Sequence, residues 1–371
     1  MTRRLYLHIG LLKTGTTFLQ DGLWMHKEEL GRRGVLVPGR HRRRHLIASL
    51  DLRDDPKLAR RAGDVSTPWQ DLVDEAREWD GHAAVISHEF FAPAAVEHIQ
   101  RAADSVGELE LHVVITARVL TELAPSLWQE WVKNGGQRGI EGFPGKAAFD
   151  PHDEWGWAAF DLADVLERWS QVVPAERIHI LPMRAGAGRT ADIWERFLEM
   201  LDVAPAELPA PEEAVNVSLG VVEIEALRRI NMRLEDFDTA GDRSRWIRTY
   251  LASTVMPNER ERFRPSEKRW NRLVAKAQHA VQILEGADYD VRGDLADLVP
   301  EVALPDLRHP RDVTEGEMLA VTTQTIATML TDVRERNRER FGLWDQIAEQ
   351  SIPPLHVRCW RRLIRFGKDR T

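Results

Sequence analysis

Four short apolar runs, separated by segments long enough to hold a helix, constrain the fold of this 371-residue chain most strongly. Each run has the length and composition of a buried strand. Strands that alternate with helices form a parallel sheet covered by helices on its faces. The runs cover residues 5–10, 83–87, 109–116 and 177–181, and helices are expected at about 17–31 and 161–173. The pattern therefore predicts an α/β fold built on a parallel sheet flanked by helices.

The pattern changes after a cluster of three prolines, Pro205, Pro209 and Pro211. Beyond this cluster the chain is mostly charged and has helical spacing. We predict an α/β core over residues 1–205 and a mainly helical extension over 206–371, packed against that core. Helices are expected in the extension at about 218–236, 242–255, 266–286 and 314–341.

The net charge of −8 and the pI of about 5.9 mean that the field of the whole molecule repels nucleic acids and anionic membranes. An anion site must therefore be local.

The single cysteine, Cys359, excludes an internal disulfide. No apolar run is long enough to span a membrane, and the first one is interrupted by His8 and Lys13, so we expect a cytoplasmic protein. The thirteen histidines lack the spacing of a metal centre, and no metal is expected.

The segment that follows the first apolar run has the composition of an anion-binding loop. It reads Gly10-Leu11-Leu12-Lys13-Thr14-Gly15-Thr16-Thr17 and lies between an expected strand and an expected helix. Glycine permits the tight turn, backbone N–H groups and the helix N-terminus attract an anion, and lysine adds a full positive charge. Threonine hydroxyls supply further donors. The loop therefore predicts a phosphate or sulfate site.

In the nucleoside-triphosphate loop the lysine directly follows the last glycine, whereas Lys13 stands two residues before Gly15. The string Lys13-Thr14-Gly15-Thr16-Thr17 closely resembles the 5'-phosphosulfate loop of sulfotransferases that use 3'-phosphoadenosine 5'-phosphosulfate (PAPS). The resemblance covers about residues 4–205 and is closest to the actinobacterial type with a helical C-terminal extension. It implies a P-loop-like sheet, PAPS as co-substrate, and Lys13 at the bridging oxygen where negative charge grows during transfer.

A second anchor for the donor is expected after the third apolar run. Arg118 closes that run, and Ser126 follows eight residues later, near the expected start of a helix. In the family that this chain resembles, such a pair binds the 3'-phosphate, and an arginine fork with a helix N-terminus suits that group. Asn216 and Ser218 resemble a further donor contact, although Ser218 is equally well explained as a helix N-cap.

Transfer to a hydroxyl requires a base, and His88 and Glu89 follow the second apolar run, at the sheet edge where chemistry is expected. Adjacent residues of an extended segment point in opposite directions, so one of the two is expected to face the acceptor. Resemblance to bacterial and Golgi-type sulfotransferases favours Glu89. The alternative is a structural pair, with the glutamate at a helix end and the histidine packed on the sheet.

Two further segments have open interpretations. Residues 134–157 are rich in glycine and aromatic residues and form either a mobile acceptor lid, with His152 as a further candidate base, or an ordinary surface loop. Residues 356–370 combine basic and apolar side chains, which suits a peripheral membrane contact or a terminal helix docked on its own domain.

The resemblance implies a sulfotransferase that acts on a hydroxyl or amine of a small-molecule, glycan or lipid acceptor and releases adenosine 3',5'-bisphosphate. The sequence identifies neither the acceptor nor the oligomeric state. Three alternatives stay open: a P-loop phosphotransferase or nucleotide hydrolase, a non-catalytic binder of phosphoadenosine nucleotides, and sulfation that prepares a leaving group for elimination or cyclisation.

Overall fold

The centre of the molecule is a six-stranded sheet in the order β2-β3-β1-β4-β5-β6, with every neighbouring pair parallel. This computed structural model describes residues 3–61, 63, 67–145, 149–184, 190–212 and 218–351. The strands are β1 (Arg4–Gly10), β2 (Val35–Leu36), β3 (Ala83–Ser87), β4 (Glu110–Ala117), β5 (Ile178–Pro182) and β6 (Asp290–Val291). The predicted α/β fold with a parallel sheet flanked by helices is confirmed.

The four predicted strands are present within one residue of their expected bounds. The sequence did not reveal β2 and β6, because two residues are too few to show an alternating pattern. Strand β6 comes from the second half of the chain and pairs with β5 through His179 and Asp290. Residues beyond 205 therefore complete one edge of the sheet.

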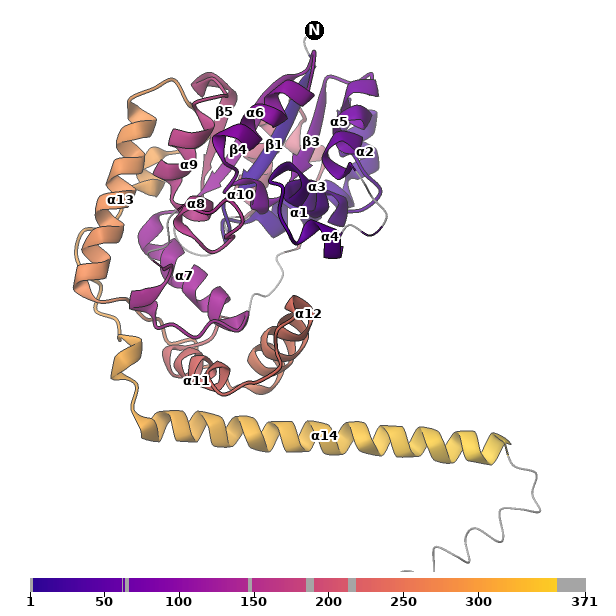
Figure 1. Ribbon diagram of the computed structural model, residues 1–371, viewed down its shortest axis with the longest axis vertical. Helices are drawn as coiled ribbons and strands as arrows, with labels where there is room; N and C mark the ends of the chain where they lie inside the picture. The colour runs from indigo at the N-terminus through magenta and orange to yellow at the C-terminus, as the bar shows by residue number, and fades with distance from the viewer. Residues whose placement is uncertain are drawn as a thin grey trace, which may run out of the picture.

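Helices cover both faces of the sheet (Figure 1). Alternate residues of the strands enter different cores: Leu5 and Leu7 pack in one cluster, and Tyr6 and Val85 in the other. The helices of the first half are α1 (Thr16–Met25), α2 (Lys27–Arg32), α3 (Arg43–Leu52), α4 (Leu58–Arg61), α5 (Pro68–Glu78), α6 (Val96–Ser105), α7 (Leu120–Lys133), α8 (Trp157–Phe160), α9 (Leu162–Trp169) and α10 (Thr190–Met200). The single helix predicted at 17–31 is two helices, because the backbone leaves helical geometry at His26.

The second half consists mainly of helices α11 (Val221–Asn231), α12 (Ala240–Asp242), α13 (Glu267–Glu285) and α14 (Glu315–Ser351), with a π-helix, η5 (Arg243–Val255). Each lies within a few residues of a predicted helix, except that α14 continues ten residues past its predicted end. Helix α13 runs along one side of the core, and α14 crosses below it (Figure 1). The short 3₁₀ turns are η1 (Glu89–Phe91), η2 (Ile140–Gly142), η3 (Ala175–Arg177), η4 (Pro205–Glu207), η6 (Leu295–Leu298) and η7 (Pro310–Asp312).

None of the helices within the described ranges combines the length and the hydropathy that a membrane span requires.

Candidate active site

The predicted site residues follow the carboxyl ends of three neighbouring strands, where parallel sheets bind their ligands. Strand β1 leads into the Lys13 loop, β3 into His88 and Glu89, and β4 into Arg118. Gly10 has a φ of 111°, and a Cβ atom at this position would lie 3.1 Å from the Cβ of Glu89. Glycine is therefore required both by the turn and by the close approach of Glu89.

The loop leaves the N-terminus of α1 open to an anion. Gly15, with a φ of 84°, is the N-cap residue, and no side chain caps the helix. The N–H groups of the first turn, from Thr16 onward, are the groups that bind anions at helix N-termini. Lys13 has a φ of 61°, a left-handed conformation that costs a non-glycine residue roughly 1 kcal/mol. The loop thus holds its lysine in a strained backbone conformation.

The loop threonines differ in their surroundings. The Thr14 hydroxyl is buried, donates to the carbonyl oxygen of Leu11 and lies 2.6 Å from the Thr116 hydroxyl. The Thr14 side chain therefore joins the loop to the end of β4. Thr16 is also buried, whereas Thr17 is exposed at the first turn of α1.

Lys13 is paired with Glu130, a contact that the sequence analysis did not predict. The Nζ atom of Lys13 lies 3.2 Å from Oε2 of Glu130, and Nε of Arg248 lies 2.9 Å from the other carboxylate oxygen. Arg248 comes from the π-helix η5 and Glu130 from α7, so residues 117 and 118 positions apart meet beside the loop. No spacing rule links such distant residues.

The charges around Glu130 favour an anion. Burial acts to raise the pKa of Glu130, but Lys13, Arg248 and Lys133 together lower it, so the carboxylate is ionised. Burial, only partly offset by Glu130, lowers the pKa of Lys133 to about 8. Three cations thus surround one carboxylate, and this local excess of positive charge attracts anions although the whole chain is acidic.

Glu89 lies against the loop as an ionised carboxylate. Its Oε2 atom accepts a hydrogen bond of 3.1 Å from the amide of Gln20 on α1. Burial acts to raise the pKa of Glu89, but His88 when protonated, the Glu89 backbone N–H and the Gln20 amide outweigh burial and lower it below its usual value. The carboxylate is therefore ionised, although its lowered pKa also makes it a weaker base.

His88 is less suited to that role. Its Nδ1 atom accepts a hydrogen bond of 3.1 Å from the backbone N–H of Phe90 and so caps η1. Burial lowers the pKa of His88 and keeps it neutral. A neutral imidazole that accepts at Nδ1 carries its proton on Nε2, so neither ring nitrogen is free to take another proton. The preference for Glu89 over His88 as the base stays a prediction.

Two buried histidines support this half of the site. Nδ1 of His8 lies 2.7 Å from the Ser87 hydroxyl, and Nδ1 of His45 accepts from the Ser87 N–H at 3.1 Å. Burial lowers the pKa of both His8 and His45 to about 4, so both are neutral. They link β1, β3 and α3 directly behind His88 and Glu89.

Arg118 forms an ion pair with Glu122, four residues further along the chain. Its Nε and Nη2 atoms lie 3.1 and 2.8 Å from one carboxylate oxygen of Glu122. Helix α7 begins at Leu120, so Ser126 lies in its second turn, and the expectation of a serine near the helix start is wrong. Ser126 shares a helix face with Glu130, four residues further on, which pairs with Lys13.

The remaining predicted donor contact lies at the border of the described residues. Ser218 is exposed and is not the N-cap of α11, a position that Gly220 occupies. The N-cap alternative for Ser218 is therefore wrong. Asn216 lies outside the described residues, as do residues 356–370.

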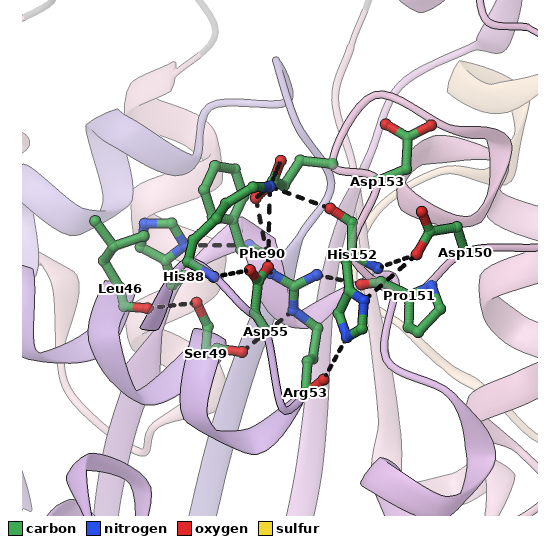
Figure 2. Close-up of polar contacts among 12 residues, drawn as sticks. Leu46, Ser49, Arg53, Asp55, His88, Phe90, Asp150, Pro151, His152 and Asp153 are labelled. Carbon is green, nitrogen blue, oxygen red and sulfur yellow. Dashed lines mark hydrogen bonds and ion pairs between the residues drawn. The ribbon is translucent and has the colours of Figure 1, made fainter. Parts of the chain in front are cut away.

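The part of the 134–157 segment nearest His88 is held by buried charges (Figure 2). The fully buried guanidinium of Arg53 binds Asp55 at 3.2 Å and the carbonyl oxygen of Pro151. His152 lies 2.9 Å from the carbonyl oxygen of Arg53 through Nε2. Lys57 contacts both oxygens of Glu154 at 2.7 Å. Residues 151–154 are thus bound to the segment after α3 by the buried Arg53 and the partly exposed Lys57, which argues against a freely mobile lid here.

A cavity of about 330 Å³ opens between this segment, α9 and α13. Its wall includes Trp157, Asp161 and Lys276, and the ammonium of Lys276 pairs with Asp161 and lies 4.9 Å from the Trp157 ring centre. None of the predicted donor or base residues lines this cavity. Within the described part of the chain, no group of three or more His, Cys, Asp or Glu side chains has the geometry of a metal site.

No family model matches the chain, and no curated protein matches it significantly. Among solved structures, a sulfotransferase from Alicyclobacillus acidocaldarius superposes with a TM-score of 0.36 and 15% sequence identity, covering 66% of this chain and 100% of that chain. A likeness of this size assigns neither a family nor an activity.

Proposed function

We propose that the chain is a PAPS-dependent sulfotransferase that moves the sulfuryl group to a hydroxyl or amine of its acceptor. The observation that carries the proposal is the loop between β1 and α1. It combines an uncapped helix N-terminus, glycines at positive φ and Lys13 beside an excess of positive charge. The order of lysine and glycine departs from that of nucleoside-triphosphate loops.

In this proposal the reaction is an in-line displacement at sulfur. The acceptor oxygen forms a new S–O bond while the S–O bond to the 5'-phosphate breaks, and adenosine 3',5'-bisphosphate leaves. Lys13 and the N–H groups of Thr16 and Thr17 stabilise the negative charge that grows on the leaving phosphate. Glu89 accepts the proton of the acceptor hydroxyl.

Donor binding changes the partner of Lys13 in this scheme. Its ammonium pairs with Glu130 in this structure and turns to the phosphosulfate when the donor enters. Glu130 keeps Arg248 as a counter-ion throughout, so its buried carboxylate is never left unpaired. Arg118 and Ser126 are assigned to the 3'-phosphate, and Arg118 must leave Glu122 to reach it.

Calorimetric titration tests the choice of nucleotide. We expect adenosine 3',5'-bisphosphate to bind at least about tenfold more tightly than ATP, with the same affinity in EDTA and in Mg²⁺, because the site has a second phosphate anchor and needs no metal. Tighter binding of ATP in a Mg²⁺-dependent manner would identify a phosphotransferase or nucleotide hydrolase. Release of the bisphosphate from PAPS by the protein distinguishes an enzyme from a binder.

A further inference from the structure

Helix α14 is anchored to its own chain along one face. Met318 and Thr325 are buried on that face, against α11 and η5. The hydroxyl of Tyr250 in η5 donates a hydrogen bond of 2.7 Å to Asp332 of α14. The helix runs below the rest of the molecule, and its C-terminal half extends past the neighbouring elements (Figure 1). The exposed part of its surface is thereby held in a fixed orientation.

Beside the packed face, α14 carries a stripe of exposed apolar side chains. Leu319, Ile326, Leu330 and Val333 are 67, 57, 66 and 49% exposed. Leu319 and Leu330 are the two most exposed large apolar side chains among the described residues. Scattered apolar residues are normal on a surface, but four on one line of one helix indicate an interaction site.

The spacing of the stripe is that of a helix-pairing seam. Successive steps of four and three residues join Leu319, Thr323, Ile326, Leu330, Val333 and Asn337. This alternation is the a and d pattern of a heptad repeat, which keeps one narrow seam toward a partner helix. Polar residues at a few such positions, here Thr323 and Asn337, set the register of the pair.

The composition of the helix disfavours a membrane as the occupant. Residues 315–338 carry four acidic and three basic side chains. A membrane-surface helix instead has a wide apolar face and a clearly basic polar face. A narrow seam interrupted by Thr323 and Asn337 fits another helix better than a lipid surface.

The seam is complementary to itself when two copies run antiparallel. With Ile326 on the twofold axis, Leu319 of one copy faces Val333 of the other, over a contact about 21 Å long. Glu315 then lies beside Arg336 of the second copy, whereas a parallel pair brings the basic ends together. The side chains that flank the seam include the small Ala320 and Ala327, which permit close approach. An identical surface that pairs about a twofold axis is the usual geometry of a homodimer.

We propose that the chain forms an antiparallel homodimer through the seam Leu319–Asn337 of α14. The seam lies beside the side of α14 that packs on α11 and η5, roughly a third of a turn around the helix from it. The proposal is independent of the reaction that the protein catalyses.

Sedimentation velocity of the full chain between about 1 and 100 µM tests the dimer. We expect a reversible monomer–dimer equilibrium. Ile326→Glu places two carboxylates on the axis and should raise the dimer dissociation constant at least about tenfold. Thr331→Glu, on the same helix but off the seam, should leave the constant unchanged, and unfolding temperatures verify that both variants fold. A wild-type chain that is monomeric throughout, or an Ile326→Glu variant that dimerises as well as the wild type, would overturn the proposal.

Disulfide crosslinking in a Cys359→Ser background tests the orientation. An antiparallel pair predicts that Leu319→Cys chains crosslink to Val333→Cys chains when the two are mixed, and that Leu319→Cys alone does not crosslink. Crosslinking of Leu319→Cys to itself would show a parallel pair and contradict the antiparallel arrangement.

Discussion

The candidate active site has two parts: the residues that follow β1 and β3, and the residues that follow β4. The two parts differ in the contacts that hold their predicted site residues. In the half formed by β1 and β3, Glu89 lies against Gly10 and accepts a hydrogen bond from Gln20, while Lys13 pairs with Glu130. In the half formed by β4, Arg118 is bound to Glu122, and Ser126 lies two turns into its helix. In the proposed reaction Glu89 therefore needs no new partner, whereas Lys13 and Arg118 must each leave a carboxylate to bind the donor.

The largest effect is expected from Lys13→Ala, in the β1 and β3 half. Loss of the charge that stabilises the leaving phosphate should lower turnover by about 10³-fold or more. Because Glu130 keeps Arg248, the fold should survive. The measurement is the release of adenosine 3',5'-bisphosphate from PAPS, with Lys268→Ala, an exposed lysine of α13, as the control. Near-normal turnover would remove Lys13 from the reaction.

A second, smaller loss is expected from Glu89→Gln. Without the base, kcat for a hydroxyl acceptor should fall by about 10² to 10⁴ while the affinity for the donor is kept. His88→Ala should change kcat by less than about tenfold, because the Nδ1 atom of His88 is already occupied. Steady-state kinetics of both variants separates the two roles, and the reverse order of effects would make His88 the base.

Lowering the pH should decrease the free energy of unfolding, because protonation of buried histidines favours the unfolded chain. Burial lowers the pKa of His8 and His45 to about 4, and both support the β1 and β3 half. Since their unfolded pKa is about 6.5, the unfolded chain binds protons first as the pH falls. Stability should be complete above about pH 6.5 and decrease down to pH 4, by roughly 3 kcal/mol for each histidine.

Chemical denaturation at several pH values measures this loss. Substitution of the exposed His279 by Gln should leave the profile unchanged. A free energy of unfolding that is constant between pH 7 and 5 would show that these histidines are not buried as described.

The smallest effects belong to the β4 half and have opposite signs. Arg118→Ala should weaken binding of adenosine 3',5'-bisphosphate by about tenfold. Glu122→Gln should tighten it a few-fold, because the competing carboxylate is removed. Adenosine 5'-phosphate lacks the 3'-phosphate and should bind both variants as it binds the wild type. Equal loss of both ligands in Arg118→Ala would contradict the assignment of Arg118 to the 3'-phosphate.

Some residues of the candidate site could be predicted from local sequence patterns, and others could not. The Lys13 loop and Glu89 follow strands with clear apolar patterns, so both could be located from local signals. Glu130 and Arg248 could not, because their contacts join distant segments through α7 and a π-helix. The start of α7 was misplaced as well: Ser126 follows Pro125, and nothing in the local pattern shows that the helix already begins at Leu120.

The most direct test of the account is a crystal structure of the protein with adenosine 3',5'-bisphosphate. We predict the 5'-phosphate within hydrogen-bond distance of the Thr16 and Thr17 N–H groups and of Lys13, and the 3'-phosphate at Arg118. The guanidinium of Arg118 should then have moved from Glu122. A nucleotide bound elsewhere, or a 5'-phosphate away from Lys13, would contradict the assignment of this loop to the sulfuryl donor.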